Sequence, residues 1–136
     1  MSRYCLDTSA YSHFLRGDSR VVEMLDTAEW IGVPSVVLGE LWVGFLAGSR
    51  LEQNEAELRE FLGNPAVEEI PIDRAVARLY AEIFVALRRA GRPLPSNDIW
   101  VAAAAVRTGS SVLTYDEHFR DIQRAGSVIL PREGRN

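Results

Sequence analysis

The chain contains no lysine, and each of its 15 cationic residues is an arginine. The absence of lysine excludes Schiff-base chemistry and the lysine of a phosphate-binding P-loop. Cysteine occurs once, at Cys5, which excludes an intramolecular disulfide and a multi-cysteine metal site. Because Cys5 lies in a short apolar run, we expect a buried, inert thiol.

Long apolar stretches are also absent. No segment approaches the roughly 18 apolar residues that a membrane span requires. The first residues, Met1 to Tyr4, lack the apolar region of a signal peptide. A cytoplasmic protein is therefore expected.

The charge balance is acidic, since 19 Asp and Glu residues outnumber the arginines and the net charge is −4. This balance argues against a simple basic nucleic-acid binder. It leaves open an enzyme that meets phosphates through bound cations, because the cations reverse the sign of an acidic site. The 136 residues are 47% apolar and 25% charged, which is typical of one globular domain.

Short apolar runs alternate with helical patterns along the chain. The runs predict five strands, at residues 4–6, 30–33, 67–70, 111–114 and 128–130. Helices are predicted between them, and the last two run from Asp98 to Val106 and from Glu117 to Arg124. Strands that alternate with helices predict an α/β fold with a largely parallel sheet.

Four acidic residues fall at ends of strands or near starts of helices. Asp7 follows the first predicted strand, Asp116 follows the fourth, and Asp98 begins a helix. Ligands of parallel sheets gather at the carboxyl ends of the strands, so these three acids should face one edge. Glu40 lies in an apolar helical stripe, where an unpaired carboxylate would cost several kcal/mol to bury.

Each acid also has a plainer interpretation. Asp98 and Asp116 could be helix N-caps, and Asp7 could be a turn residue. Acids that converge on one point would repel one another unless a hard divalent cation held them. Carboxylate oxygens favour Mg²⁺ or Mn²⁺ over Zn²⁺. The residues alone leave both interpretations open.

Three segments of the chain resemble the PIN-domain ribonucleases, and specifically the VapC toxins of bacterial toxin–antitoxin pairs. These segments are residues 6–17, residues 31–44 and residues 98–119. No single motif in them is decisive, whereas their order and spacing over nearly the whole chain are specific. The resemblance implies a three-layer PIN-like fold with a central, mainly parallel sheet, built from a PIN domain over residues 1–131 and followed by a polar tail over residues 132–136.

The resemblance also implies a function and a site. The function is hydrolysis of RNA phosphodiester bonds by water activated on Mg²⁺ or Mn²⁺. Asp7, Glu40, Asp98 and Asp116 match the family's acidic metal-binding and catalytic quartet, and Thr114 matches the hydroxyl residue beside the last acid.

The sequence departs from several relatives at one position of this site. His118 stands where they carry a further acid, which leaves the occupancy of a second metal site open. The imidazole could be a metal ligand, or it could contact its own backbone or RNA.

A toxin implies a protein partner, here a VapB-like antitoxin in a hetero-oligomer. We predict that it inserts an amphipathic segment beside Trp42 and Phe45, with an arginine that reaches the acids. A homodimer is also predicted, because the chain holds more large apolar groups than one sheet face needs. These groups are Trp42, Phe45, Leu46, Tyr80, Phe84 and Leu87.

Three alternatives compete with this interpretation. A phosphatase of the haloacid-dehalogenase type also places Asp after its first strand, but Ser9 stands where it needs a second acid, and lysine is absent. A non-catalytic interaction module on the same fold is disfavoured by the presence of all four acids. A housekeeping PIN-domain RNA-processing nuclease remains the alternative, and the short chain without appended domains favours the toxin.

Overall fold

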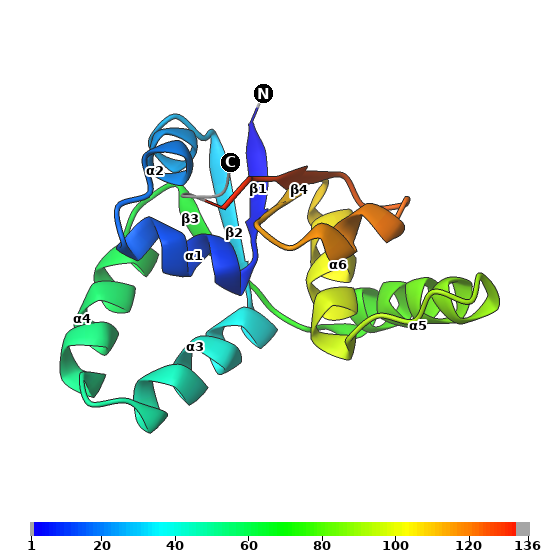
Figure 1. Ribbon diagram of the computed structural model, residues 1–136, viewed down its shortest axis with the longest axis horizontal. Helices are drawn as coiled ribbons and strands as arrows, with labels where there is room; N and C mark the ends of the chain where they lie inside the picture. Colours follow the sequence, from blue (N-terminus) through cyan, green and yellow to red (C-terminus); the bar gives the residue numbers. More distant parts are fainter. Residues whose placement is uncertain (1, 133–136) are drawn as a thin grey trace.

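A five-stranded sheet forms the centre of the protein (Figure 1). The computed structural model describes residues 2–132. The strands are β1 (Arg3–Leu6), β2 (Trp30–Pro34), β3 (Val67–Ile70), β4 (Ser111–Thr114) and β5 (Ser127–Ile129). Their order is β3-β2-β1-β4-β5, and each neighbouring pair is parallel. The predicted α/β fold with a parallel sheet is confirmed.

Helices cover both faces of this sheet and complete three layers (Figure 1). On one face lie α1 (Thr8–Leu15), α2 (Ser19–Asp26), α3 (Ser35–Ala47) and α4 (Leu51–Leu62). On the other face lie α5 (Arg74–Arg89) and α6 (Ser96–Thr108). A short 3₁₀ segment, η1 (Glu117–Asp121), connects β4 with β5. Within residues 2–132, no helix combines the length and the apolar character that a membrane crossing needs.

The chain changes direction at β1, because β2 and β3 lie on one side of it and β4 and β5 on the other. Parallel α/β sheets bind ligands at the carboxyl ends of their strands beside such a switch point. Asp7 directly follows β1 at this edge, and α3 and η1 begin beside it after β2 and β4. The topology therefore brings together segments that are far apart in the sequence.

Two predicted helix bounds are wrong. Helix α6 begins at Ser96, because the N–H group of Asp98 already donates to the carbonyl of Pro95 at 3.1 Å, so Asp98 lies within the first turn. The helix predicted for residues 117–124 is the shorter 3₁₀ segment η1. It ends because Ile122 leaves the helical conformation and buries its side chain in the core.

The expectation for Cys5 is confirmed, since its side chain is fully buried. Burial raises the pKa of its thiol, which keeps it protonated and unreactive. The predicted domain end at residue 131 stays a prediction. Of the predicted tail, residues 133–136 lie outside the described residues.

One core side chain carries an unsatisfied polar atom. The hydroxyl of Tyr11 is buried and has no hydrogen-bond partner among the described residues. Its ring packs edge-on against Phe61, with 5.2 Å between the ring centroids. Burial, aided by the negative charge of Glu57, raises the pKa of Tyr11 to about 12.

We expect Tyr11→Phe to stabilise the protein. The substitution keeps the ring contacts and removes a polar group whose burial without a partner costs about 1 to 3 kcal/mol. The free energy of unfolding in urea should therefore rise by about 1 kcal/mol. Tyr115→Phe is the matched control, because the buried Tyr115 hydroxyl donates to Asp18 at 2.6 Å and its loss should destabilise the protein. A Tyr11→Phe variant that is less stable than the parent would show that the hydroxyl has a partner in solution.

Candidate active site

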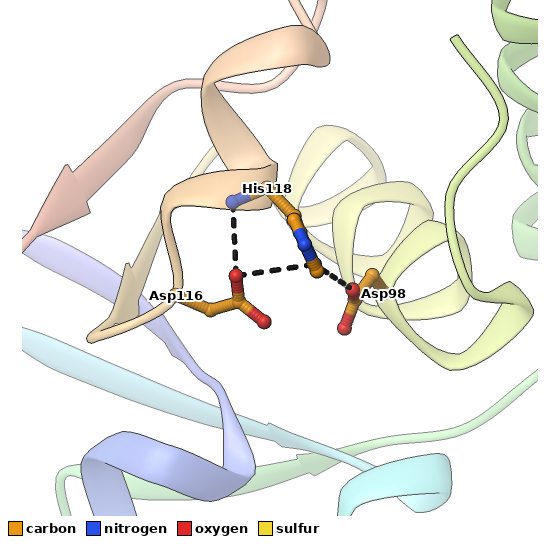
Figure 2. A group of neighbouring side chains, drawn as sticks. All are labelled: Asp98, Asp116 and His118. Carbon is orange, nitrogen blue, oxygen red and sulfur yellow. Dashed lines mark hydrogen bonds and ion pairs between the residues drawn. The ribbon is translucent and has the colours of Figure 1, made fainter.

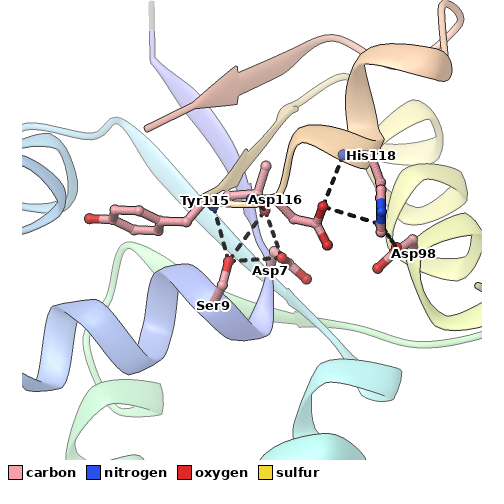
Figure 3. Close-up of polar contacts among 7 residues, drawn as sticks. Asp7, Ser9, Asp98, Tyr115, Asp116 and His118 are labelled. Atoms are coloured by element: carbon pink, nitrogen blue, oxygen red, sulfur yellow. Dashed lines mark hydrogen bonds and ion pairs between the residues drawn. The ribbon is translucent and has the colours of Figure 1, made fainter. Parts of the chain in front are cut away.

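Asp7 lies at the centre of a hydrogen-bond network (Figure 3). Only 6% of its surface is exposed, since it follows β1 directly and its N–H group donates to the carbonyl of Leu113 in β4. The hydroxyl of Thr114 donates to Asp7 Oδ2 at 2.7 Å, and the hydroxyl of Ser9 donates to the same oxygen at 3.0 Å. Burial raises the pKa of the Asp7 carboxyl, and these hydrogen bonds oppose the rise only in part.

The hydroxyls of Ser9 and Thr114 also connect the two chain segments that lie on either side of Asp7. Thr114 is fully buried, and its hydroxyl accepts a hydrogen bond from the N–H group of Asp116 at 2.9 Å. The hydroxyl of Ser9 accepts one from the N–H group of Tyr115 at 3.0 Å. The start of α1 is thereby tied to the end of β4, and this fixes how Asp7 and Asp116 face each other.

Asp98 approaches the same edge from α6. Its position in the first turn favours a negative charge, because the N-terminus of a helix carries a partial positive charge. Even so, burial together with the negative charges of Asp7 and Asp116 raises its pKa to about 6. His118 opposes this rise. Asp98 is therefore electrostatically coupled to two of the other acids.

Asp116 and His118 complete this side of the site (Figure 2). Asp116 caps η1, since its Oδ1 accepts a hydrogen bond from the N–H group of His118 at 2.9 Å. The imidazole Nδ1 of His118 lies 3.2 Å from Asp116 Oδ1 and 3.5 Å from Asp98 Oδ2. Asp116 is therefore the N-cap that the sequence allowed, and its carboxylate also faces the other acids.

Glu40, in the second turn of α3, lies at the rim of the site. Its side chain is half-buried, and its Oε1 accepts a hydrogen bond from the hydroxyl of Thr8 at 2.9 Å. Its charge contributes to the raised pKa of Asp7. Helix α3 buries Val37, Leu38 and Leu41 and directs Glu40 to the rim, so its carboxylate avoids the cost of unpaired burial, and its place in the acidic quartet stays a prediction.

The donor set fits a divalent cation. Asp98, Asp116 and His118 each offer one ligand atom, and these atoms lie within 4.8 Å of one another. Carboxylate oxygens are the ligands that Mg²⁺ and Mn²⁺ prefer, and a cation would offset the repulsion that raises the pKa of Asp98. The structure thus brings Asp7, Asp98, Asp116 and Thr114 together and places Glu40 beside them.

Sequence reasoning did not assign a role to Ser9. Its hydroxyl donates to Asp7 and lies 3.3 Å from the hydroxyl of Thr114. Two consecutive hydroxyl residues directly after a strand-ending Asp were the signal available. The position of His118 depends on the 3₁₀ geometry of η1, which no sequence pattern specified.

Comparison with known proteins agrees with this architecture. Residues 4–125 match the PIN domain family. Ribonuclease VapC5 of Mycobacterium tuberculosis is 30% identical to this chain over 127 residues, which are 93% of each chain. Ribonuclease VapC4 of the same organism is 38% identical over 91 residues, which are 67% of this chain and 69% of that protein.

Solved structures share the fold. A DNA-bound VapBC from Salmonella typhimurium has a TM-score of 0.84 at 23% identity, with 95% of this chain and 98% of that chain covered. VapBC2 from Rickettsia felis, bound to a promoter DNA fragment, has a TM-score of 0.83 at 22% identity, with 96% and 99% covered. The chain therefore belongs to the PIN domain family, and its sequence relatives place it in the VapC group of that family.

Proposed function

We propose that this chain is a divalent-metal-dependent endoribonuclease of the cytoplasm and the toxin of a VapBC-type pair. It would hydrolyse RNA phosphodiester bonds and stop translation and growth until an antitoxin binds it. The observation that carries the proposal is the convergence of Asp7, Asp98 and Asp116, with Glu40 at the rim, at the carboxyl edge of the sheet. The ribonuclease names of its relatives support RNA as the substrate.

The site residues would divide the work as follows. Asp7, Asp98, Asp116 and Glu40 would hold the cation. When bound, a divalent cation supplies Lewis-acid chemistry, lowering the pKa of a coordinated water and offsetting the charge that develops on the phosphate. Thr114 and Ser9 hold Asp7 Oδ2 in one orientation, so that this carboxylate needs little reorganisation during the reaction. Thr114 is in this account a positioning residue.

Metal removal tests the proposal. We expect the purified chain to cleave a mixture of cellular RNAs with Mn²⁺ or Mg²⁺, and to lose at least about a hundredfold in rate with a chelator, since metal activation of water contributes several kcal/mol. Glu82→Gln is the matched control, because it removes a carboxylate remote from the site and should keep full activity. Phosphatase activity on a small phosphomonoester without RNA cleavage would favour the haloacid-dehalogenase alternative, and cleavage that persists with a chelator would contradict the proposal.

The proposed antitoxin has an exposed apolar surface to bind on α3, the helix that also carries Glu40. On α3, Val43 and Leu46 are each 69% exposed and Trp42 is 36% exposed. The expectation that Phe45 shares this surface is wrong, because Phe45 is buried. The toxin–antitoxin complexes among the structural neighbours, such as those of Salmonella typhimurium and Rickettsia felis, support a protein partner for this chain too.

Antitoxin and metal should compete. An arginine that reaches the acids would neutralise the same charge as the cation, so each should weaken the other by an equal factor. We expect calorimetric titration with the cognate antitoxin to give an affinity that falls as Mn²⁺ rises. An affinity indifferent to metal would mean that inhibition works away from the acids.

The predicted homodimer stays a prediction, and fewer apolar side chains are available for it than the sequence indicated. Of the apolar groups on α5, Leu87 is buried, and Tyr80 stacks on Trp100 of α6 with 3.8 Å between the ring centroids. These side chains are therefore used inside the chain. The exposed Val43 and Leu46 on α3 remain available for self-association.

A further inference from the structure

The imidazole of His118 faces the acidic site, although nothing in the proposed chemistry needs a histidine there. The side chain is 55% exposed, yet its ring points inward between Asp98 and Asp116 (Figure 2). The nitrogen on this side is Nδ1, 3.2 Å from Asp116 Oδ1 and 3.5 Å from Asp98 Oδ2. His118 and the two acids thus surround one point.

This placement is held from two directions. The backbone of His118 is anchored by its hydrogen bond to Asp116 in the cap of η1. The next residue, Phe119, is buried in the core with 1% of its surface exposed. The backbone of His118 therefore has a fixed position beside the acids, from which Nδ1 reaches both carboxylates.

The separations match those of ligand atoms that share one ion. Adjacent ligands of an octahedral ion at about 2.1 Å lie about 3.0 Å apart. The two distances from Nδ1 exceed this by a few tenths of an ångström, which rotation of the side chains can close. A hydrogen bond between imidazole and carboxylate would give similar spacing, so the two roles have to be separated by the kind of metal that binds.

We propose that His118 Nδ1 is a metal ligand alongside Asp98 and Asp116, and that it shifts the preference of the site from Mg²⁺ toward transition-metal dications. The proposal rests on the metal dependence of the proposed function. Mg²⁺ favours oxygen ligands and retains its waters, whereas the affinity of a nitrogen donor rises from Mn²⁺ to Co²⁺ along the first transition row.

The test is the affinity of purified chain and His118→Asn variant for three ions, Mg²⁺, Mn²⁺ and Co²⁺, measured by calorimetry without RNA. The variant should lose less than about threefold for Mg²⁺, about tenfold for Mn²⁺ and more than tenfold for Co²⁺, because only the nitrogen contribution grows along this order. The control is Glu117→Gln, which removes a charge from the same 3₁₀ segment and should change the three affinities alike and by less than about twofold.

A role of His118 through charge alone predicts another pattern. All three affinities would then change by one factor, and that result would overturn the proposal. If the parent chain binds none of the ions, the proposed metal site itself fails, whereas tight binding with unchanged ranking in the variant overturns only the role of His118.

A second measurement does not depend on the variant being folded. Spin-echo modulation in the electron paramagnetic resonance of Mn²⁺ bound to the parent chain should show coupling to an imidazole nitrogen. Its absence would also overturn the proposal.

Discussion

Asp7→Asn should abolish RNA cleavage while the chain stays folded. The amide has the shape of the carboxylate and can still accept the hydrogen bonds of Ser9 and Thr114, but it lacks the charge that a cation requires. We expect the cleavage rate to fall on the order of a thousandfold, the size seen when one electrostatic contribution to a transition state is removed. Initial rates on RNA measure the effect, and growth inhibition should vanish with it.

The same variant should be at least as stable as the parent when no metal is bound. Burial raises the pKa of Asp7, so the metal-free fold carries an ionised group at a cost that asparagine removes. The melting temperature without metal should therefore be unchanged or higher. Asp26→Asn, at the exposed end of α2, is the control and should keep the parental rate. Cleavage by Asp7→Asn at the parental rate in saturating Mn²⁺ would refute the assignment of this carboxylate.

Millimolar Mn²⁺ should raise the melting temperature strongly. A ligand present at a hundred times its dissociation constant and bound only to the folded state adds about 2.7 kcal/mol. For a chain of this size that corresponds to roughly 10 °C. Thermal scans with Mn²⁺ and with a chelator measure the shift. Asp98→Asn should melt higher than the parent without metal and respond less to Mn²⁺, and a parent without any response would contradict a four-acid pocket.

The metal-free protein should also respond to pH with a definite sign. The pKa of Asp98 is raised to about 6 in the folded chain, so the folded state binds this proton more tightly than the unfolded state. The contribution of Asp98 to stability is present at low pH and is lost as the pH rises through about 6. The chelated protein should accordingly melt higher near pH 5.5 than near pH 7.5, and Asp98→Asn should flatten this dependence.

Two strands were predicted with their full bounds. Strands β3 and β4 begin and end at the residues that the sequence pattern indicated. The convergence of Asp7 and Asp116 followed from one rule about the edges of parallel sheets. No such rule showed which side chains of α3 stay exposed after packing, and the expectation for Phe45 failed for that reason.

The remaining features depend on packing between distant segments. The inward ring of His118 follows from a 3₁₀ turn whose length is set by the burial of Phe119 and Ile122. The stacking of Tyr80 on Trp100 depends on how α5 crosses α6. Such contacts are decided by the folded chain as a whole and have no signature within a short window of sequence.

The tie between the start of α1 and the end of β4 has a consequence for when activity can arise. Ser9 and Thr114, which hold the same carboxylate, are separated by 105 positions in the chain. A ribosome must therefore add β2, β3 and the helices between them before the second of these hydroxyls exists, and β4 must then insert beside β1 in the middle of the sheet. Nascent or truncated chains that end before β4 lack both Thr114 and Asp116 and carry an incomplete acidic centre. A complete acidic centre therefore requires a chain that extends through β4 to Asp116 and has folded β4 into the sheet.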